Sequence, residues 1–155
     1  MSKFYYADSS SLVKRHVAEI GSHWVRNEFN AASGNIVITA KISVVEVLSA
    51  LNRRQREAAL TTTDYQDIAK DFLKVIELEY ETIEITDAVL LESKRLLEVY
   101  PLRAGDAVQL ASAIISQNLL SAKNLSPLTF LASDVRLLNA AQGEGLITDD
   151  PQNHP

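Results

Sequence analysis

The stretch LRAGDAVQLASAIISQ, from Leu102 to Gln117, decides the fold of this chain. Its apolar residues form a surface too broad for a helix that packs on one side only, so we expect a helix covered on more than one side. Pro101 stands directly before it and separates it from the preceding helix. The first turn carries Asp106, where a carboxylate is favoured by the helix dipole and is also placed to hold a cation. The stretch therefore predicts a buried helix whose first turn has either an electrostatic or a metal-binding role.

Outward from this helix, strand-like and helix-like segments alternate along the chain. Residues 36–39 (IVIT) form a continuous β-branched run, which is typical of a parallel strand covered on both faces. The expected order of segments is strand 3–8, helices 11–33 (interrupted near Gly21), strand 36–39, helices 42–60 and 63–78, strand 82–86, helices 87–100 and 102–117, loop 118–127, strand 128–133, helix 134–145 and a short strand 146–150. This alternation predicts an α/β fold with an open parallel sheet of four to five strands, flanked by helices on both faces.

The length and composition indicate one globular domain. The chain has 155 residues, and we expect residues 1–150 to form a single domain and 151–155 a frayed tail. Cysteine is absent, which excludes disulfides, thiol catalysis and cysteine–zinc sites. The N-terminal residues are too polar for a signal peptide, and no apolar run approaches the roughly 20 residues of a membrane span. We therefore expect a soluble, cytoplasmic protein that has no contact with membranes.

The net charge of −5 argues against broad electrostatic adhesion to nucleic acid. It does not exclude a nucleic-acid enzyme whose carboxylates hold metal ions, because the metal then supplies the positive charge. The densest basic cluster is Arg53, Arg54 and Arg56. These side chains could contact RNA phosphates, but we prefer to interpret them as a solvated helix face. The three histidines show no metal-ligand spacing and no evident carboxylate partner, and we expect them at the surface.

Four acids occupy related places in the predicted fold. Asp8 follows the first strand and Asp134 follows the fourth, and the carboxyl ends of parallel strands share one edge of a sheet. Glu46 lies in the first turns of the helix after the second strand, and Asp106 opens the helix that leads toward the fourth strand. Converging carboxylates repel one another unless protons or cations lie between them. Oxygen-only ligands suit Mg²⁺ or Mn²⁺, and a metal held this way can activate water for phosphodiester hydrolysis.

Each acid also has a purely structural interpretation. The two acids that follow strands can cap the next helix. Ser43 and Glu46 fit a capping box at a helix start. Arg103 and Asp106 are three residues apart on one helix and fit a surface ion pair, which is worth a few tenths of a kcal/mol.

The segments that carry these acids resemble the PIN-domain ribonucleases, specifically the VapC-type toxins of bacterial and archaeal toxin–antitoxin pairs. The similar segments are YYADSSSLVK, ISVVEVLSAL, LRAGDAVQLASA and TFLASDVRLLNAAQGEGL, which cover nearly the whole chain in the family's order. The resemblance implies a parallel α/β sheet flanked by helices and RNA cleavage that depends on Mg²⁺ or Mn²⁺. It also implies a cognate VapB-like antitoxin as partner and, often, a homodimer.

The resemblance further implies a set of site residues. It assigns the metal-site carboxylates to Asp8, Glu46, Asp106 and Asp134. It suggests that Ser10 takes part through hydroxyl hydrogen bonds to a carboxylate, a metal-bound water or a phosphate. Because the last acid is the family's most variable one, Asp134 would either bind the metal or only orient water or another ligand. Arg103, beside the expected site, would contact phosphate or neutralise the carboxylates.

Two other functions stay open at this point. A phosphatase that forms an aspartyl-phosphate would place its nucleophile at Asp8, but such enzymes usually have a second Asp two residues on, where this chain has Ser10. A catalytically inactive PIN-like binding module would use the same acids only as helix caps and ion pairs. Saturable Mn²⁺ binding that depends on Asp8 and Asp106 distinguishes the metal enzyme from the binding module.

Overall fold

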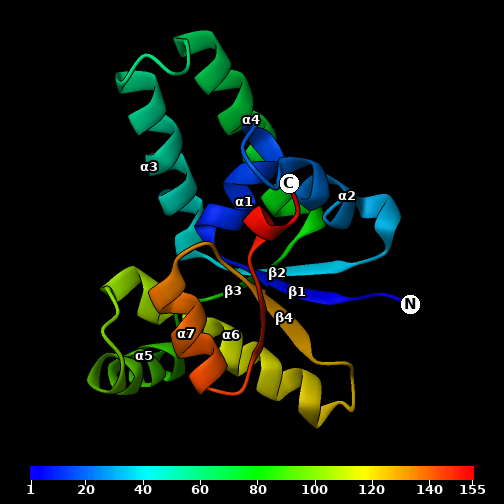
Figure 1. Cartoon of the computed structure of the whole chain (residues 1–155), viewed down its shortest axis with the longest axis vertical. Coiled ribbons are helices and arrows are strands. Elements are labelled where there is room, and N and C mark those ends of the chain that lie inside the picture. The colour runs from blue at the N-terminus through cyan, green and yellow to red at the C-terminus, as the bar shows by residue number, and fades with distance from the viewer.

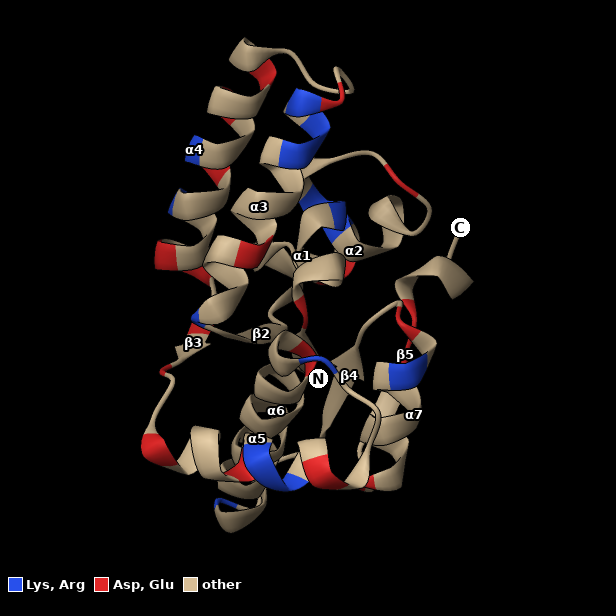
Figure 2. Ribbon diagram, turned by 90° about the vertical axis from the view of Figure 1, so that its left-hand side faces the viewer, with Lys and Arg blue, Asp and Glu red and all other residues tan.

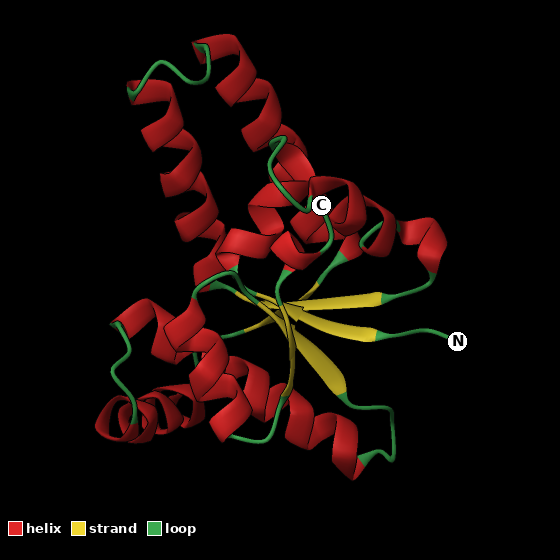
Figure 3. Cartoon of the chain, in the orientation of Figure 1, coloured by secondary structure: helices red, strands yellow, loops and turns green.

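The computed structural model describes all residues from 1 to 155 and has one five-stranded sheet (Figures 1 and 3). All neighbouring strands are parallel, and their order is β3-β2-β1-β4-β5. The strands are β1 (Phe4–Ala7), β2 (Ile36–Ala40), β3 (Glu81–Ile83), β4 (Leu128–Leu131) and β5 (Ile147–Asp149). The prediction of an α/β fold with an open parallel sheet is therefore confirmed.

Helices cover both faces of the sheet, as the sequence predicts (Figure 1). On one face lie α1 (Ser9–His16), α2 (Ser22–Glu28), α3 (Ile42–Arg56) and α4 (Thr62–Glu79); on the other lie α5 (Asp87–Val99), α6 (Ala104–Ala122) and α7 (Val135–Gly143). Two short 3₁₀ helices, Ala31–Ser33 and Pro151–Asn153, complete the chain. Alternate residues of β1 face the two cores, because Tyr6 packs in the α5–α7 core while Tyr5 and Ala7 pack in the α1–α4 core.

Helix α6 is the buried helix that the opening stretch predicts, but it is longer than expected. Leu110, Ala111 and Ala113 have no exposed surface. The helix continues to Ala122, so the first part of the expected loop 118–127 is helical. Leu120, which is only 8% exposed, maintains the apolar stripe through this polar segment. None of the helices is both long and apolar enough to cross a membrane.

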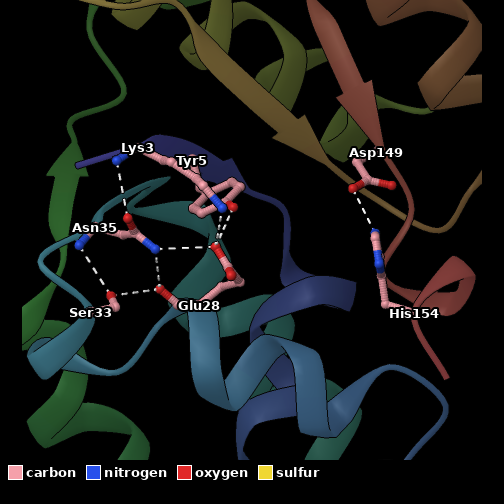
Figure 4. A network of polar contacts seen from close by, with 7 residues as sticks. All are labelled: Lys3, Tyr5, Glu28, Ser33, Asn35, Asp149 and His154. Carbon is pink, nitrogen blue, oxygen red and sulfur yellow. Dashed lines mark hydrogen bonds and ion pairs between the residues drawn. The ribbon is translucent and has the colours of Figure 1, made fainter. Parts of the chain in front are cut away.

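The end of the chain is ordered against α2, although the sequence suggested a frayed tail. Pro151 is buried, and the ring of His154 stacks on Trp24 with centroids 4.2 Å apart. His154 Nε2 also lies 2.8 Å from Asp149 Oδ2 (Figure 4). The stacking on Trp24 joins residues far apart in the sequence, so the local composition of residues 151–155 does not indicate it.

Candidate active site

The acid that ends β1 lies where the strand order changes direction. Strands β2 and β3 lie on one side of β1, and β4 and β5 lie on the other. The backbone N–H of Asp8 donates to the carbonyl of Leu131, the last residue of β4, at 3.1 Å. In open parallel sheets, ligands bind at this point, beyond the carboxyl ends of the strands. Asp8 is therefore at the entrance to the crevice that the topology predicts.

The Asp8 carboxylate is buried, and no basic side chain pairs with it. Its Oδ1 accepts hydrogen bonds from the backbone N–H of Ser11 at 2.9 Å and from the hydroxyl of Ser10 at 2.7 Å. Burial raises the pKa of Asp8 to about 6, and the charge of Glu46 acts in the same direction, while the hydrogen bonds from both serines oppose it. Asp8 does cap α1, but capping alone does not account for a carboxylate that is 6% exposed beside another acid.

Glu46 projects from α3 toward the first turn of α6. Its Oε1 accepts from Nε2 of Gln109 at 2.9 Å, and its Oε2 has a long contact of 3.4 Å with the hydroxyl of Ser9. A Cβ atom on Gly105 would lie 3.4 Å from Oε2, which is an ordinary van der Waals distance, so the first turn of α6 passes close to the carboxylate. Glu46 is thus held between α1, α3 and α6.

The capping-box interpretation of Glu46 is wrong. The N-cap of α3 is Lys41, which forms no side-chain cap, and Ser43 is already inside the helix. The Ser43 hydroxyl lies 2.7 Å from the Thr39 hydroxyl and accepts from the Gln109 amide at 2.8 Å. Glu46 therefore has no structural role at the start of its own helix.

Asp106 and Asp134 form a second pair of acids. Asp134 caps α7, because its Oδ1 accepts from the backbone N–H groups of Arg136 at 2.8 Å and Leu137 at 3.2 Å. Burial raises the pKa of Asp106, the charge of Asp134 raises it further, and Arg103 opposes the shift. Arg103 is exposed at the N-cap of α6, and the structure contains no ion pair between Arg103 and Asp106.

The first turn of α6 connects the two pairs of acids. Gly105 lies close to Glu46, and the next residue, Asp106, is close enough to Asp134 to be affected by its charge. As the side chains stand, however, no three acids or histidines are grouped closely enough to hold a metal ion. The available donors are carboxylate and hydroxyl oxygens, which fit Mg²⁺ or Mn²⁺ and not zinc or copper. The assignment of all four acids as ligands stays a prediction.

A groove of about 660 Å³ opens beside Glu46 and Ser10. Its walls come mainly from α1 and α3 and include the basic residues Lys14, Arg53 and Arg54. Figure 2 shows basic residues in blue along the far part of α3. Glu19 pairs with Lys14 Nζ at 3.1 Å and also contacts Arg54. Two of the arginines that we preferred to interpret as a solvated helix face therefore line a groove next to an acidic site.

Sequence reasoning missed Gln109 and Gly105 as parts of this site. Gln109 lies three residues after Asp106 in the opening stretch and is 1% exposed. A glutamine among the apolar residues of a buried helix was a usable signal, because buried polar groups need hydrogen-bond partners. The contact of Gly105 with Glu46 had no such signal, since it depends on how α6 packs against α3.

Comparisons with known proteins agree with this architecture. Residues 5–122 match the model of the PIN domain family. VapBC2 from Rickettsia felis, solved bound to a DNA fragment from their promoter, has a similar fold, with a TM-score of 0.60 and 14% identity over 95% of this chain and 98% of that one. FitAcB from Neisseria gonorrhoeae (TM-score 0.61, 11% identity) and a toxin–antitoxin complex from Klebsiella pneumoniae (0.58, 13%) each cover 95% of this chain and 97% of their own. A comparison with curated proteins gave no match. Because the family model spans most of the chain, this protein belongs to the PIN domain family.

Proposed function

We propose that the protein is a metal-dependent endoribonuclease of the VapC type. The single observation that carries this proposal is the buried Asp8 carboxylate, which has Glu46 as a neighbour of the same charge and no basic partner. Such an arrangement is costly unless a cation or a proton compensates it. Lys14 and Arg54 in the wall of the nearby groove are paired with Glu19, and the exposed Arg53 beside them offers a contact for a phosphate of an RNA strand.

In this proposal Asp8, Glu46 and Asp106 hold Mg²⁺ or Mn²⁺, and Asp134 assists directly or through water. When bound, the metal ion supplies a water of lowered pKa and positive charge at the scissile phosphate. Ser10 keeps the Asp8 carboxylate oriented through its hydrogen bond to Oδ1. Arg103, exposed beside Asp106, binds a substrate phosphate.

The alternatives are less well supported. An inactive binding module would use the acids only for structure. Asp8 and Asp134 do cap helices, but the Ser43–Glu46 capping box and the Arg103–Asp106 ion pair are both absent. A phosphatase of this type usually has a second Asp two residues after the nucleophile, where it can protonate the leaving group. Residue 10 is a serine whose hydroxyl donates to Asp8 itself. Trapping a phospho-aspartate at Asp8 would reverse this preference.

We further propose that the protein acts in the cytoplasm as the toxin of a pair with a small VapB-like antitoxin, and that it forms a homodimer. The similar folds of VapBC2, FitAcB and the Klebsiella pneumoniae toxin–antitoxin complex support the antitoxin partner, because each covers nearly all of this chain. Copurification with the product of an adjacent small gene tests the antitoxin partner. Light scattering, which gives the molar mass of the purified protein, tests the homodimer.

The first test is cleavage of RNA by antitoxin-free protein. We expect internal cuts in the presence of Mg²⁺ or Mn²⁺, complete loss of cutting in EDTA, and recovery when Mn²⁺ is returned in excess, because the carboxylates alone cannot activate water. Products are resolved on denaturing gels. An Asp106→Asn preparation made in parallel controls for contaminating ribonucleases. Cutting that survives EDTA, or that is equal in the Asp106→Asn protein, would refute the proposal.

A second prediction concerns the groove. Arg53→Gln is expected to weaken RNA binding several-fold and to lower the slope of log affinity against log salt by about 0.7, which is the loss of one phosphate contact to a single strand. Arg56 lies on the same helix but outside the groove wall, so Arg56→Gln is the matched control. Fluorescence anisotropy with labelled RNA in Ca²⁺, over a series of salt concentrations, measures both. Equal effects of the two substitutions would indicate that Arg53 is part of a solvated helix face and makes no phosphate contact.

A further inference from the structure

A buried amide connects Glu46 to the core of the molecule. The hydroxyl of Tyr6 donates to Gln109 Oε1 at 2.7 Å. Gln109 Nε2 donates to Glu46 Oε1 at 2.9 Å and to the hydroxyl of Ser43 at 2.8 Å. A glutamine amide has two N–H donors and one carbonyl acceptor, so every part of this side chain is used. Tyr6, Ser43 and Gln109 are each at most 1% exposed, and water does not compete for these bonds.

The contacts allow only one orientation of the Gln109 amide. If the amide were turned by half a rotation, its carbonyl oxygen would face the Glu46 carboxylate, and two acceptors would meet without a proton between them. The hydroxyls of Ser43 and Thr39 continue the hydrogen bonds in the same donor-to-acceptor direction, away from Gln109. Thr39 Oγ1 donates to the carbonyl of Ala7 at 2.7 Å, so the Ser43 hydroxyl, 2.7 Å away, donates to Thr39.

One directed chain of hydrogen bonds therefore runs from Gln109 through Ser43 and Thr39 to the peptide that precedes Asp8. A second bond of the same amide ends on Glu46. The chain joins α6, α3, β2 and β1, which meet at the acidic edge of the sheet. The acids at the ends of β1 and in α3 are thus positioned by a common buried network.

We infer that Gln109 is a positioning residue for metal binding, because its amide holds Glu46 Oε1, while Oε2 has only the long 3.4 Å contact with the Ser9 hydroxyl. This inference rests on the proposed function. Gln109 does not touch the reacting atoms; it acts through Glu46. Hydrogen-bonded partners of this kind typically contribute 10–100-fold to metal affinity, since they orient the ligand and prevent it from turning away.

A merely structural role for Gln109 would make the same contacts, so the test needs a variant that disturbs the network without freeing Glu46. Gln109→Met has a similar length and volume and removes all three bonds. Tyr6→Phe removes only the bond to Oε1 and leaves the Nε2 contact with Glu46 in place. Both variants disturb the buried network, but only the methionine variant releases the carboxylate.

The experiment is isothermal titration calorimetry of Mn²⁺ into the wild type and the two variants, which needs no catalysis. Circular dichroism first confirms that each is folded at the chosen temperature. We expect Gln109→Met to weaken Mn²⁺ binding by about 10–100-fold and Tyr6→Phe to leave it near the wild-type value. Gln109→Asn, whose amide is one methylene too short to reach Glu46, is expected to behave like the methionine variant and replaces it if that protein does not fold.

The outcomes separate the inference from the proposed function. If the wild type binds Mn²⁺ and Gln109→Met or Gln109→Asn binds it equally well, Gln109 has only a structural role and the inference is overturned. If Tyr6→Phe weakens binding as much as Gln109→Met, general disturbance of the core explains both and the inference is again overturned. If the wild type shows no saturable binding, the proposed metal-dependent function fails and the inference fails with it.

Discussion

Asp8→Asn is expected to abolish RNA cleavage and, at the same time, to make the metal-free protein more stable at pH 8. Cleavage should fall by at least about 100-fold, because the substitution removes a charged ligand from the proposed metal site. The fold should survive, since an asparagine Oδ1 can still accept from the backbone N–H of Ser11 and the hydroxyl of Ser10, as the carboxylate does. Gel assays with Mn²⁺ and urea denaturation in EDTA measure the two effects on the same preparation.

The gain in stability follows from the direction of the Asp8 pKa shift. The folded-state pKa is about 6, against 3.8 for an unperturbed aspartate. Well below pH 3.8 both the folded and the unfolded chain hold this proton, and the shift has no effect. As the pH rises from 4 through 6, the unfolded chain releases the proton first, so the free energy of unfolding decreases. At pH 8 the difference between these two pKa values corresponds to about 3 kcal/mol in favour of the asparagine variant.

The control for this prediction is Asp67→Asn, because Asp67 is exposed on α4. That variant should cut RNA as the wild type does. Mn²⁺ should stabilise the wild type and not Asp8→Asn. An asparagine variant that cleaves RNA at the wild-type rate, or that is less stable than the wild type at pH 8 in EDTA, contradicts the interpretation of Asp8 as an uncompensated buried charge.

The fold was predictable because its signals are local. A buried helix after Pro101, the β-branched run at 36–39 and the alternation of strand-like and helix-like segments all depend on neighbouring residues, and the structure confirms the architecture they predict. The boundaries were less accurate where packing decided them. Helix α6 continues through 118–122 because Leu120 packs in the core, in spite of the polar residues around it.

The site was predictable in outline only. The positions of Asp8 and Asp134 after strands placed them at one edge of the sheet, as parallel strands require. The contacts that hold Glu46 come from Gln109 on α6 and Ser9 on α1, and these depend on a helix packing that no local pattern encodes.

The histidines show the same limit. His16, which we expected at the surface without a carboxylate partner, is buried, with Nδ1 at 3.2 Å from Asp71 Oδ2. Its side chain is covered because α4 brings Phe72 against α1, with the two rings 5.5 Å apart. Burial lowers the pKa of His16, and the charge of Asp71 opposes this. Patterns among neighbouring residues cannot indicate a partner that lies more than fifty residues away along the chain.

Gly21→Ala is expected to lower the free energy of unfolding by about 2–4 kcal/mol. Gly21 has φ +87°, a conformation that costs an L-residue about 1–2 kcal/mol. An added Cβ would also lie 2.2 Å from the carbonyl oxygen of Pro151, so the end of the chain must move away. That movement disturbs the stacking of His154 on Trp24, worth about 0.5–1.5 kcal/mol, and the burial of Pro151.

Gly145→Ala separates the backbone cost of the positive φ from the steric clash with Pro151. Gly145 has φ +83°, but nothing lies within 4 Å of the position of its Cβ, so this variant has only the backbone cost. Thermal and urea unfolding should therefore show Gly21→Ala to be clearly less stable than Gly145→Ala, with a difference of about 1–2 kcal/mol. Equal losses would mean that residues 151–155 contribute no stability through α2. Because Gln152 is in the wall of the groove beside Glu46, release of this segment should also weaken RNA binding in Gly21→Ala and leave it unchanged in Gly145→Ala.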